Sequence, residues 1–467
     1  MHEIQLTNGK HGHTLNATQI FSPDGKWLVF DTRHDDTHIS RTGNICKLNI
    51  ATKEIIELYK TKNQSIYGPG VGAAAWNPVN DSIIFIHGLL NCNEEKPYSF
   101  TRRFGAIISG NHEAGENAEI GVRQSSHNGT VAEGRSIQEP LTKGALRGGT
   151  HAHTWSADGK WISFTYNDYL MECLEKTSSS KRKDLRTIGV MTMVENIHED
   201  HEAGENAEIG VRQQCPAENF RGTYFAVITA KVTENPKFGS DEIERAFDEC
   251  WLGKNGYIKE DGSQQTRAIA FQGNVRSNDG VLVTEVFIAD IPNDITQSLT
   301  DKPLEGTLND RPNVPAGLVQ RRVTFTTERK HPGLQGPRFR LRSSADGSQI
   351  YFLMKDDNDI VQIYSVSSIK NTENTITNQP LKQITNFKYS VQSQFNLSPD
   401  DKYISVVSNN QIYLVNAQDG STTSVGERYS EREAPINGVH WSPDGKSLIY
   451  NRYVFIEDDY YIQIFKR

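Results

Sequence analysis

Short runs of alternating apolar and polar residues recur along the whole chain, and a tight-turn phrase splits each of them. The phrase joins an apolar residue to Ser-Pro-Asp-Gly-Lys or a close variant, and a β-rich run follows it. Proline, aspartate and glycine favour a tight turn and period-two alternation favours strands, so each copy predicts a strand, a turn and a second strand. The six copies occupy Phe21–Phe30, Trp76–Ile86, Trp155–Phe164, Ser343–Phe352, Leu397–Val407 and Trp441–Tyr450.

The spread of these copies over the chain predicts an all-β fold, a seven-bladed β-propeller that forms a single domain over residues 1–467. Four-stranded units arranged in a ring bury their faces and protect their edges. A Leu-Thr or Ile-Thr phrase is predicted to end the outer strand of several blades, at Ile137–Thr142, Val323–Thr326 and Leu381–Thr385. The N-terminal Glu3–Thr7 has the same form, so it is predicted to complete the last blade and close the ring.

Blade four lacks the turn phrase, and its strands are predicted at Gly222–Val232, Arg267–Val275 and Thr284–Ile291. Between the first two strands, Gly239–Trp251 has a capping serine, acidic residues in its first turn and apolar residues at helical spacing. These features predict a short amphipathic helix that packs on the ring as an insertion. Insertions are predicted over residues 110–136, 195–220 and 233–265.

A second repeat has thirteen residues, HEAGENAEIGVRQ, and occurs without change at His112–Gln124 and His201–Gln213. Both copies follow the predicted third strand of a blade, Phe104–Ser109 in blade two and Thr187–Val194 in blade three. One interpretation is a recent duplication in exposed loops away from the channel, which leaves Ile120 and Ile209 outside the core. The other is a paired acidic docking element.

Composition excludes several classes of protein. The net charge of −8 and the pI near 6.0 disfavour a nucleic-acid partner, which usually meets a basic surplus. A membrane-spanning helix needs a run of about 18 apolar residues, and the sequence has no such run. The N-terminal residues do not show the pattern of a secretory signal. A cytoplasmic or periplasmic monomer is expected. The five cysteines are widely spaced without a CxxC, so neither a disulfide framework nor a zinc site is expected.

Candidate functional residues gather where the propeller topology brings loops together. The loops that enter the inner strands and those that join the second and third strands lie on one face, around the channel mouth. The entry loops supply His11, His13, His151, His153, Arg338, Arg340, Gln392, Gln394, Asn437 and His440. The cross-loops supply Arg33, His34, Asp35, Asp36, His38, Arg41, His87, Arg102, Arg103, Tyr166, Asp168, Arg276, Lys355 and Arg452. Such an Arg- and His-rich face suits an anionic ligand.

The His-Ala-His of blade three is the most specific of these features. Residues two apart on a strand point to the same side, so His151 and His153 are predicted to act together. With His440 or His13 from a neighbouring blade they could hold a divalent metal. The alternative is that these histidines pack between blades or are satisfied by hydrogen bonds.

The turn phrase over nearly the whole chain resembles the TolB-like β-propellers. Within that group, DTRHDDTHISRTGNIC, LRGGTHAHTWSADGKWISFTYND and GSDEIERAFDECW resemble the bacterial YidR family. The resemblance implies the propeller fold and carries no defined activity.

A more distant resemblance is to oligogalacturonate lyase, a seven-bladed propeller that binds manganese through a Gln and several His at the channel mouth. That family uses a His and an Arg in β-elimination from a uronate. The resemblance implies a divalent metal, manganese or calcium, held by His151, His153, His440 and Gln394. The chain departs from the lyase pattern because Gly149 and Thr150 precede His151, where a Gln-x-x-His-x-His string is absent.

Two hypotheses follow. The first is a lyase that cleaves an anionic, uronate-containing oligosaccharide by β-elimination, with a His base, an Arg or metal clamp and a nearby Tyr or His acid. Its candidate catalytic residues are His151, His153, His440, Arg338 and Tyr166, and its candidate substrate-binding residues are His13, Arg33, His34, Arg102 and Arg340. The second is a TolB-like platform that binds a protein or a saccharide without turnover. Converging His and Arg side chains favour the first, and splayed side chains favour the second.

Overall fold

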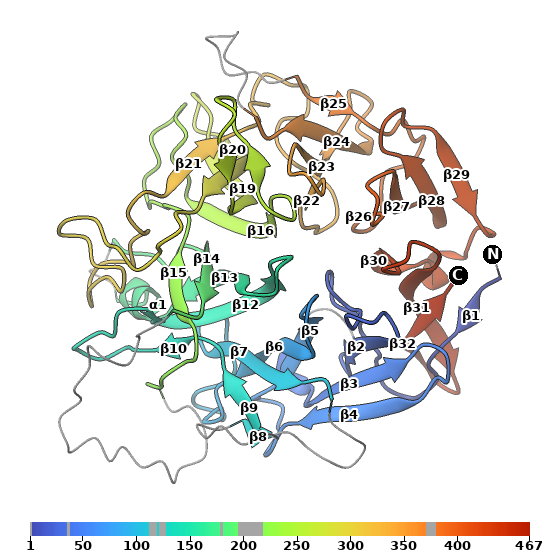
Figure 1. Cartoon of the computed structure of the whole chain (residues 1–467), viewed down its shortest axis with the longest axis horizontal. Coiled ribbons are helices and arrows are strands. Elements are labelled where there is room, and N and C mark those ends of the chain that lie inside the picture. Colours follow the sequence, from blue (N-terminus) through green and yellow to red (C-terminus); the bar gives the residue numbers. More distant parts are fainter. Residues whose placement is uncertain are drawn as a thin grey trace.

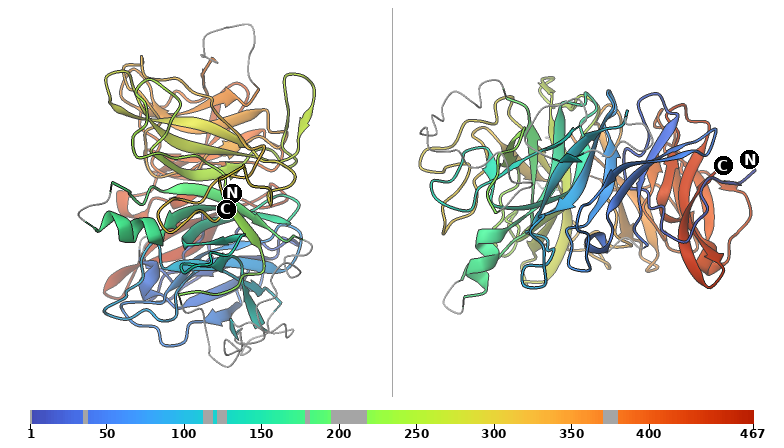
Figure 2. Two further views of the ribbon diagram at one scale, coloured as in Figure 1. Left: turned by 90° about the vertical axis from the view of Figure 1, so that its left-hand side faces the viewer. Right: turned by 90° about the horizontal axis from the view of Figure 1, so that it is seen from below.

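The computed structural model describes residues 2–34, 38–111, 119–120, 128–177, 181–194, 218–369 and 380–467. Seven sheets follow one another around a central axis, with their inner edges next to that axis (Figure 1). The seven-bladed propeller is therefore confirmed. Figure 2 shows the ring edge-on, with the helix α1 (Tyr169–Glu175) projecting from one face.

Each blade runs from an inner edge next to the axis to an outer edge at the rim of the ring. In blade one, isolated bridges from Thr14 to Asp31 and from Phe21 to Leu28 place residues 14–21 at the inner edge. The strands β2 (Trp27–Asp31), β3 (Asn44–Asn49) and β4 (Ile55–Lys60) follow towards the outer edge. Blade two has β5 (Val71–Trp76), β6 (Ser82–Gly88), β7 (Arg103–Ser109) and β9 (Asn128–Val131), with β8 (Glu119–Ile120) beside β9. Blade three has β12 (Gly148–Trp155), β13 (Trp161–Asp168), β14 (Thr187–Thr192) and β15 (Phe225–Ile228). Blade four has β16 (Arg245–Trp251), β19 (Ala268–Arg276), β20 (Leu282–Asp290) and β21 (Val319–Arg322).

Blade five has β22 (Arg342–Ser343), β23 (Gln349–Lys355), β24 (Val361–Ser367) and β25 (Lys382–Gln383). Blade six has β26 (Asn396–Leu397), β27 (Tyr403–Ser408), β28 (Gln411–Asn416) and β29 (Thr422–Val425). Blade seven has β30 (Ile436–Trp441), β31 (Leu448–Ile456), β32 (Asp459–Lys466) and β1 (Ile4–Gln5). Two further pairs, β10 (Gly134–Arg135) with β11 (Ala145–Leu146) and β17 (Tyr257–Ile258) with β18 (Gln264–Gln265), lie outside the blades, as do the 3-10 turns η1 (Ile39–Arg41) and η2 (Glu431–Glu433).

The N-terminal strand closes the ring, as predicted. Strand β1 pairs antiparallel with β32, with Ile4 opposite Lys466 and Gln5 opposite Phe465. Glu3 lies in the same closure, where its carboxylate accepts hydrogen bonds from Tyr429, Tyr450 and Arg452. The first and last segments of the chain thus share one sheet, which leaves blade seven without an unpaired outer edge at β32.

The turn phrase recurs because its side chains complete the turn. In blade one, Ser22 Oγ donates to Asp24 at 2.7 Å and accepts from the Trp27 backbone N–H at 3.0 Å. Serine–aspartate pairs at the same place in the phrase make the same contact in four later blades, namely Ser156–Asp158, Ser344–Asp346, Ser398–Asp400 and Ser442–Asp444. Local side-chain chemistry therefore fixes these turns before any packing between blades.

Blade four was predicted wrongly. The segment Gly239–Trp251 is not a helix, because its second half forms β16, the inner strand of the blade. A bulge between Phe247 and Cys250 shifts the strand register and breaks the period-two pattern, which produced the apparent helical spacing. The predicted strand within Gly222–Val232 is β15, the outer strand of blade three.

Two other segments differ from prediction. The outer strand of blade two is β9 rather than Ile137–Thr142, and it pairs with β7 inside the stretch predicted as an insertion over residues 110–136. Likewise the predicted insertion over 233–265 contains β16. The thirteen-residue copies, with the side chains of Ile120 and Ile209, lie outside the described residues except for the backbone of β8.

Candidate functional site

A repeated backbone irregularity shapes the channel wall. The inner strands of blades two, three, four and seven each carry a register shift against the next strand. Each shift contains a non-glycine residue with positive φ: Ala73 at 56°, Ala152 at 63°, Asp248 at 49° and Asn437 at 60°. A β-bulge turns the side chains that follow it, so these strands no longer alternate between two faces.

The bulge falls between His151 and Thr154, so the regular strand alternation that predicted a joint role for His151 and His153 does not hold there. Because Ala152 has positive φ, the two imidazoles make different contacts. His153 Nε2 lies 2.9 Å from Thr150 Oγ1 and faces Gly105 of blade two. The ring of His151 lies 6.4 Å from the ring of Phe100 and senses the charges of Arg103, Arg186 and Arg338.

Four arginines from four consecutive blades converge beside His151, and we refer to them as the arginine cluster. They are Arg103 at the start of β7, Arg186 just before β14, Arg245 at the start of β16 and Arg338 shortly before β22. Each shifts the pKa of at least one other member or of His151 through its charge. In each blade the inner strand and the third strand run in the same direction, so both begin at the same end of the blade. All four arginines lie at or near such a strand start, and they therefore lie on one face of the ring.

The aromatic ring of Phe100 packs against two arginines of the cluster. Its ring is 57% exposed, and the guanidinium carbons of Arg103 and Arg186 lie 4.9 and 5.4 Å from its centroid. Arg103 donates to the Tyr98 hydroxyl at 3.0 Å, but its Nε and Nη2 atoms are buried without a hydrogen-bond partner among the described residues. An acceptor for these two donors would have to come from outside the described residues.

The electrostatics of the cluster favour an anion. Burial, together with the charges of Arg245, Arg103 and Arg338, lowers the pKa of Arg186 to about 10. Asp248 offsets this charge in part, with its carboxylate 3.4 Å from Arg338 Nη2. Burial and the neighbouring guanidinium groups hold the pKa of His151 well below its usual range, so its imidazole is neutral at neutral pH. The Nδ1 atom of His151 has no hydrogen-bond partner in the part of the chain that the structure describes.

The other predicted arginines lie in different surroundings. Arg340, which precedes β22 of blade five, donates to Thr154 Oγ1 and to the Ala152 carbonyl of blade three. Arg33 forms a bidentate ion pair with Asp31 between blades one and two. Arg102 binds Glu218 and Asn91. Among the predicted arginines, Arg338 thus has the most open side chain near His151, being 62% exposed.

The predicted histidine and glutamine ligands are spread around the ring. His13 stacks on His11 at 4.3 Å, and exposed His34 packs edge-on against Tyr461. The inner strands β30 and β12 end at the turn phrase with Trp441 and Trp155. His440 is one residue from this end of its strand and His151 is four residues from it, so the two histidines lie at different heights in their blades. The side chain of Gln394 contacts Gly438 of blade seven.

These positions do not fit a metal centre. No group of three or more His, Cys, Asp or Glu side chains in the described part of the chain is placed to hold a metal ion. His153 is instead held in a buried network, in which the hydroxyl of Thr150 donates to Glu133. Burial raises the pKa of Glu133 to about 7 and lowers that of His153 to about 3, so His153 is a neutral, structural side chain at neutral pH.

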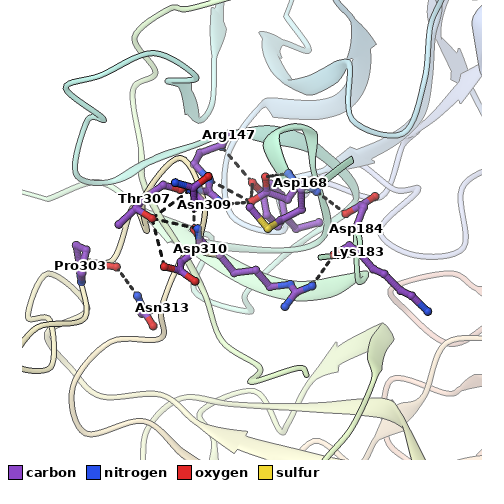
Figure 3. Close-up of polar contacts among 12 residues, drawn as sticks. Arg147, Asp168, Lys183, Asp184, Pro303, Thr307, Asn309, Asp310 and Asn313 are labelled. Carbon is purple, nitrogen blue, oxygen red and sulfur yellow. Dashed lines mark hydrogen bonds and ion pairs between the residues drawn. The ribbon is translucent and has the colours of Figure 1, made fainter. Parts of the chain in front are cut away.

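Tyr166 belongs to a buried ion-pair network in blade three rather than to the arginine cluster. Its hydroxyl donates to Asp168 at 3.1 Å and accepts from the Arg147 backbone N–H. Arg147 also pairs with Asp168 at 2.6 Å and donates to the carbonyls of Thr307 and Asp310, which belong to the long connection between β20 and β21 (Figure 3). This network joins blade three to blade four.

Replacement of Arg147 by alanine is expected to lower the free energy of unfolding by about 3–5 kcal/mol, because it leaves the Asp168 carboxylate buried without its cation. Denaturant unfolding followed by fluorescence measures this loss. Replacement of the exposed Arg338 by alanine is the control and should leave stability nearly unchanged. Equal stability of the two variants would contradict a structural role for Arg147.

Several residues of the site were missed from the sequence. Arg186 immediately precedes the third strand of blade three, and Arg103 begins that of blade two. This correspondence between blades is the sequence signal that could have identified Arg186. Arg245 and Asp248 were missed because their segment was predicted as a helix. Phe100 gives no signal of its own, since its role depends on two arginines from different blades.

Comparison with known proteins gives one extensive match. The "Uncharacterized protein YidR" of Escherichia coli strain K12 is 34% identical over 450 residues, which are 96% of this chain and 94% of that protein. Residues 70–206 match the family described as "Protein of unknown function (DUF3748)".

Solved structures share the architecture at low identity. An oligogalacturonate lyase in complex with manganese is 11% identical with a TM-score of 0.48, covering 99% of this chain and 92% of the other. TolB from Acinetobacter baumannii is 14% identical with a TM-score of 0.34, covering 87% and 65% of the two chains. These likenesses concern the propeller fold and carry no argument about activity.

Within the described residues, no helix is long and apolar enough to cross a membrane.

Proposed function

This chain belongs to the YidR family, and we propose that it binds a uronate-containing oligosaccharide at the arginine cluster and cleaves it by β-elimination. The observation that carries the proposal is the convergence of Arg103, Arg186, Arg245 and Arg338 beside a neutral His151. Guanidinium groups bind carboxylates through paired hydrogen bonds, and the exposed ring of Phe100 offers a surface for a sugar ring.

The chemistry requires three roles. Pairing the uronate carboxylate with a guanidinium stabilises the negative charge that develops when the neighbouring carbon loses its proton. The electrons of that C–H bond form the new carbon–carbon double bond, and the bond to the glycosidic oxygen breaks. The leaving oxygen must then take up a proton, so the reaction needs a base, an anion clamp and an acid.

Residues beside the cluster match these roles. His151 is the proposed base because its imidazole is neutral and its Nδ1 atom is unpartnered among the described residues. The buried, unpartnered Nε and Nη2 of Arg103 are the proposed clamp. Tyr98 is the proposed acid, since its hydroxyl accepts from Arg103 at 3.0 Å and keeps its own proton to donate. No step is assigned to a metal, to Tyr166 or to His440.

The direct test is a panel of oligosaccharides containing galacturonate, glucuronate, mannuronate or guluronate, followed by the ultraviolet absorbance of the unsaturated product. Turnover of at least one substrate is expected, with neutral oligosaccharides as the control. Replacement of His151 by glutamine should lower turnover about 100-fold, the usual contribution of a positioned base, while binding changes little. Saturable binding of a uronate without any product would favour a binding platform instead. Absence of both binding and turnover would reject the proposal.

A further inference from the structure

A concave site lies at the opposite end of the inner strands from the arginine cluster. It is a groove of about 370 Å³ between blades one, two, six and seven, where the turn phrases leave the inner strands. Its walls include Phe21, Trp76, Leu397, His440 and Trp441. Pro23, Pro78, Pro399 and Pro443 from four turn phrases form its rim.

Hydrogen bonds hold the walls of the groove in place. The side-chain amide of Gln19 donates to the Trp155 carbonyl at 2.7 Å and accepts from the Trp155 N–H at 2.8 Å. Asn396 donates to the Val439 carbonyl and accepts from Arg342, and Trp441 Nε1 donates to the Asn396 carbonyl. A groove with walls fixed in this way binds a ligand with little ordering cost.

Three polar groups of the same groove are left without partners. Thr18 Oγ1, Trp76 Nε1 and His440 Nε2 are buried and make no hydrogen bond to any described residue. Trp76 is only 2% exposed and His440 only 5%. An unsatisfied buried polar group costs roughly 1–3 kcal/mol, and three around one groove point to a ligand that satisfies them.

The groove is also uncharged. None of the residues that line it is an Asp, Glu, Lys or Arg. Burial, with the nearby charge of Arg342, lowers the pKa of His440 to about 3, so this imidazole is neutral. The ligand should therefore carry no charge. It should offer both donors and acceptors, because Trp76 can only donate while a hydroxyl and a neutral imidazole can do either.

We propose that this groove binds a neutral saccharide unit, with a ring face against Phe21 or Trp441 and hydroxyl groups on Thr18, Trp76 and His440. A hydroxyl both donates and accepts, which matches the mixed set of unpartnered groups. A flat, apolar ring face suits the aromatic walls. The inference concerns a different end of the channel from the proposed lyase site and does not depend on it.

The test uses maltotriose, cellotriose, galactotriose and mannotriose with the full-length protein, followed by tryptophan fluorescence and by calorimetry. Trp76 and Trp441 line the groove, so saturable binding of at least one trisaccharide should change the emission. Replacement of Thr18 by valine or of His440 by leucine should weaken that binding about tenfold. His331→Leu, which alters a histidine between β21 and β22, is the matched control and should bind normally.

Thr18→Val keeps the shape of the side chain, so it should preserve folding even if His440→Leu does not. The proposal is overturned if none of the trisaccharides binds, or if binding persists unchanged in Thr18→Val. It is also overturned if poly-L-proline, rather than a saccharide, binds in a way that Thr18→Val weakens.

Discussion

Replacement of both Arg103 and Arg186 by methionine is expected to weaken binding of a uronate oligosaccharide about 1000-fold. A charge-assisted hydrogen bond contributes roughly 1.5–3 kcal/mol, and the variant loses the contacts of two guanidinium groups. Methionine keeps much of the apolar stem that packs on Phe100. Calorimetry at low and high salt measures the effect, because the wild-type affinity should fall with salt more steeply than that of the variant.

The same variant separates a binding role from a structural one. Burial lowers the pKa of Arg186 most, and the charges of Arg245 and Arg103 lower it further, so removing both guanidinium groups should leave Tm unchanged or raise it. Arg428→Met, which alters an exposed arginine between β29 and η2, is the matched control and should bind normally. Unchanged affinity in the double variant would reject the arginine cluster as the anion site.

Protein stability is expected to fall steeply as pH drops from about 6.5 towards 5. Burial, the largest cause in each case, lowers the pKa of His13 and His87 to about 4 and that of His153 and His440 to about 3. The pKa of His151 is also well below its usual range. These five imidazoles stay neutral in the folded chain but take up protons in the unfolded chain once the pH falls below about 6.5. These histidines therefore do not lower the free energy of unfolding above a pH of about 6.5, and they lower it increasingly as the pH falls below that value.

The size of this effect follows from linkage. At a pH of about 5, each of the four histidines with a pKa of about 3 or 4 costs roughly 2 kcal/mol, or roughly 8 kcal/mol together. Several buried carboxyl groups act in the opposite direction. Burial raises the pKa of Glu133 to about 7 and that of Asp184 to about 6, and it also raises the pKa of Glu249 and Asp401. Glu133 and Asp184 together return roughly 4 kcal/mol between pH 7.5 and 5, which leaves a net loss of about 4 kcal/mol, a large part of a typical folding free energy.

Denaturant unfolding between pH 7.5 and 5 measures this loss. His87→Gln should reduce it by about 2 kcal/mol, since one titrating group is removed while glutamine can still accept from Tyr59. Tyr59→Phe removes the same hydrogen bond without removing a histidine, so its pH dependence should match that of the wild type. A flat stability profile in the wild type would show that the buried histidines are protonated without penalty.

The sequence indicates which types of residue gather at the candidate site better than it indicates which particular residues meet there. The sequence predicts an Arg- and His-rich mouth, and the structure places Arg103, His151 and Arg338 there. It predicts a joint role for His151 and His153, yet the two side chains have different partners. The spacing of two residues implies one face only if the strand is regular, and a left-handed Ala152 cannot be inferred from the letters His-Ala-His.

Features of the fold that arise from contacts between neighbouring residues can be read from the sequence. The serine–aspartate turn forms from contacts within five residues, so its repetition predicts the strands, the number of blades and the closing role of Glu3–Thr7. The tertiary structure alone decided the bulges, the identity of the inner strand of blade four and the meeting of Arg186 and Arg245 with Arg103. It also decided that His440 lines a groove at the other end of the strands. These features arise from strand pairing and blade packing between residues far apart in the chain, and no local pattern encodes which of them will meet.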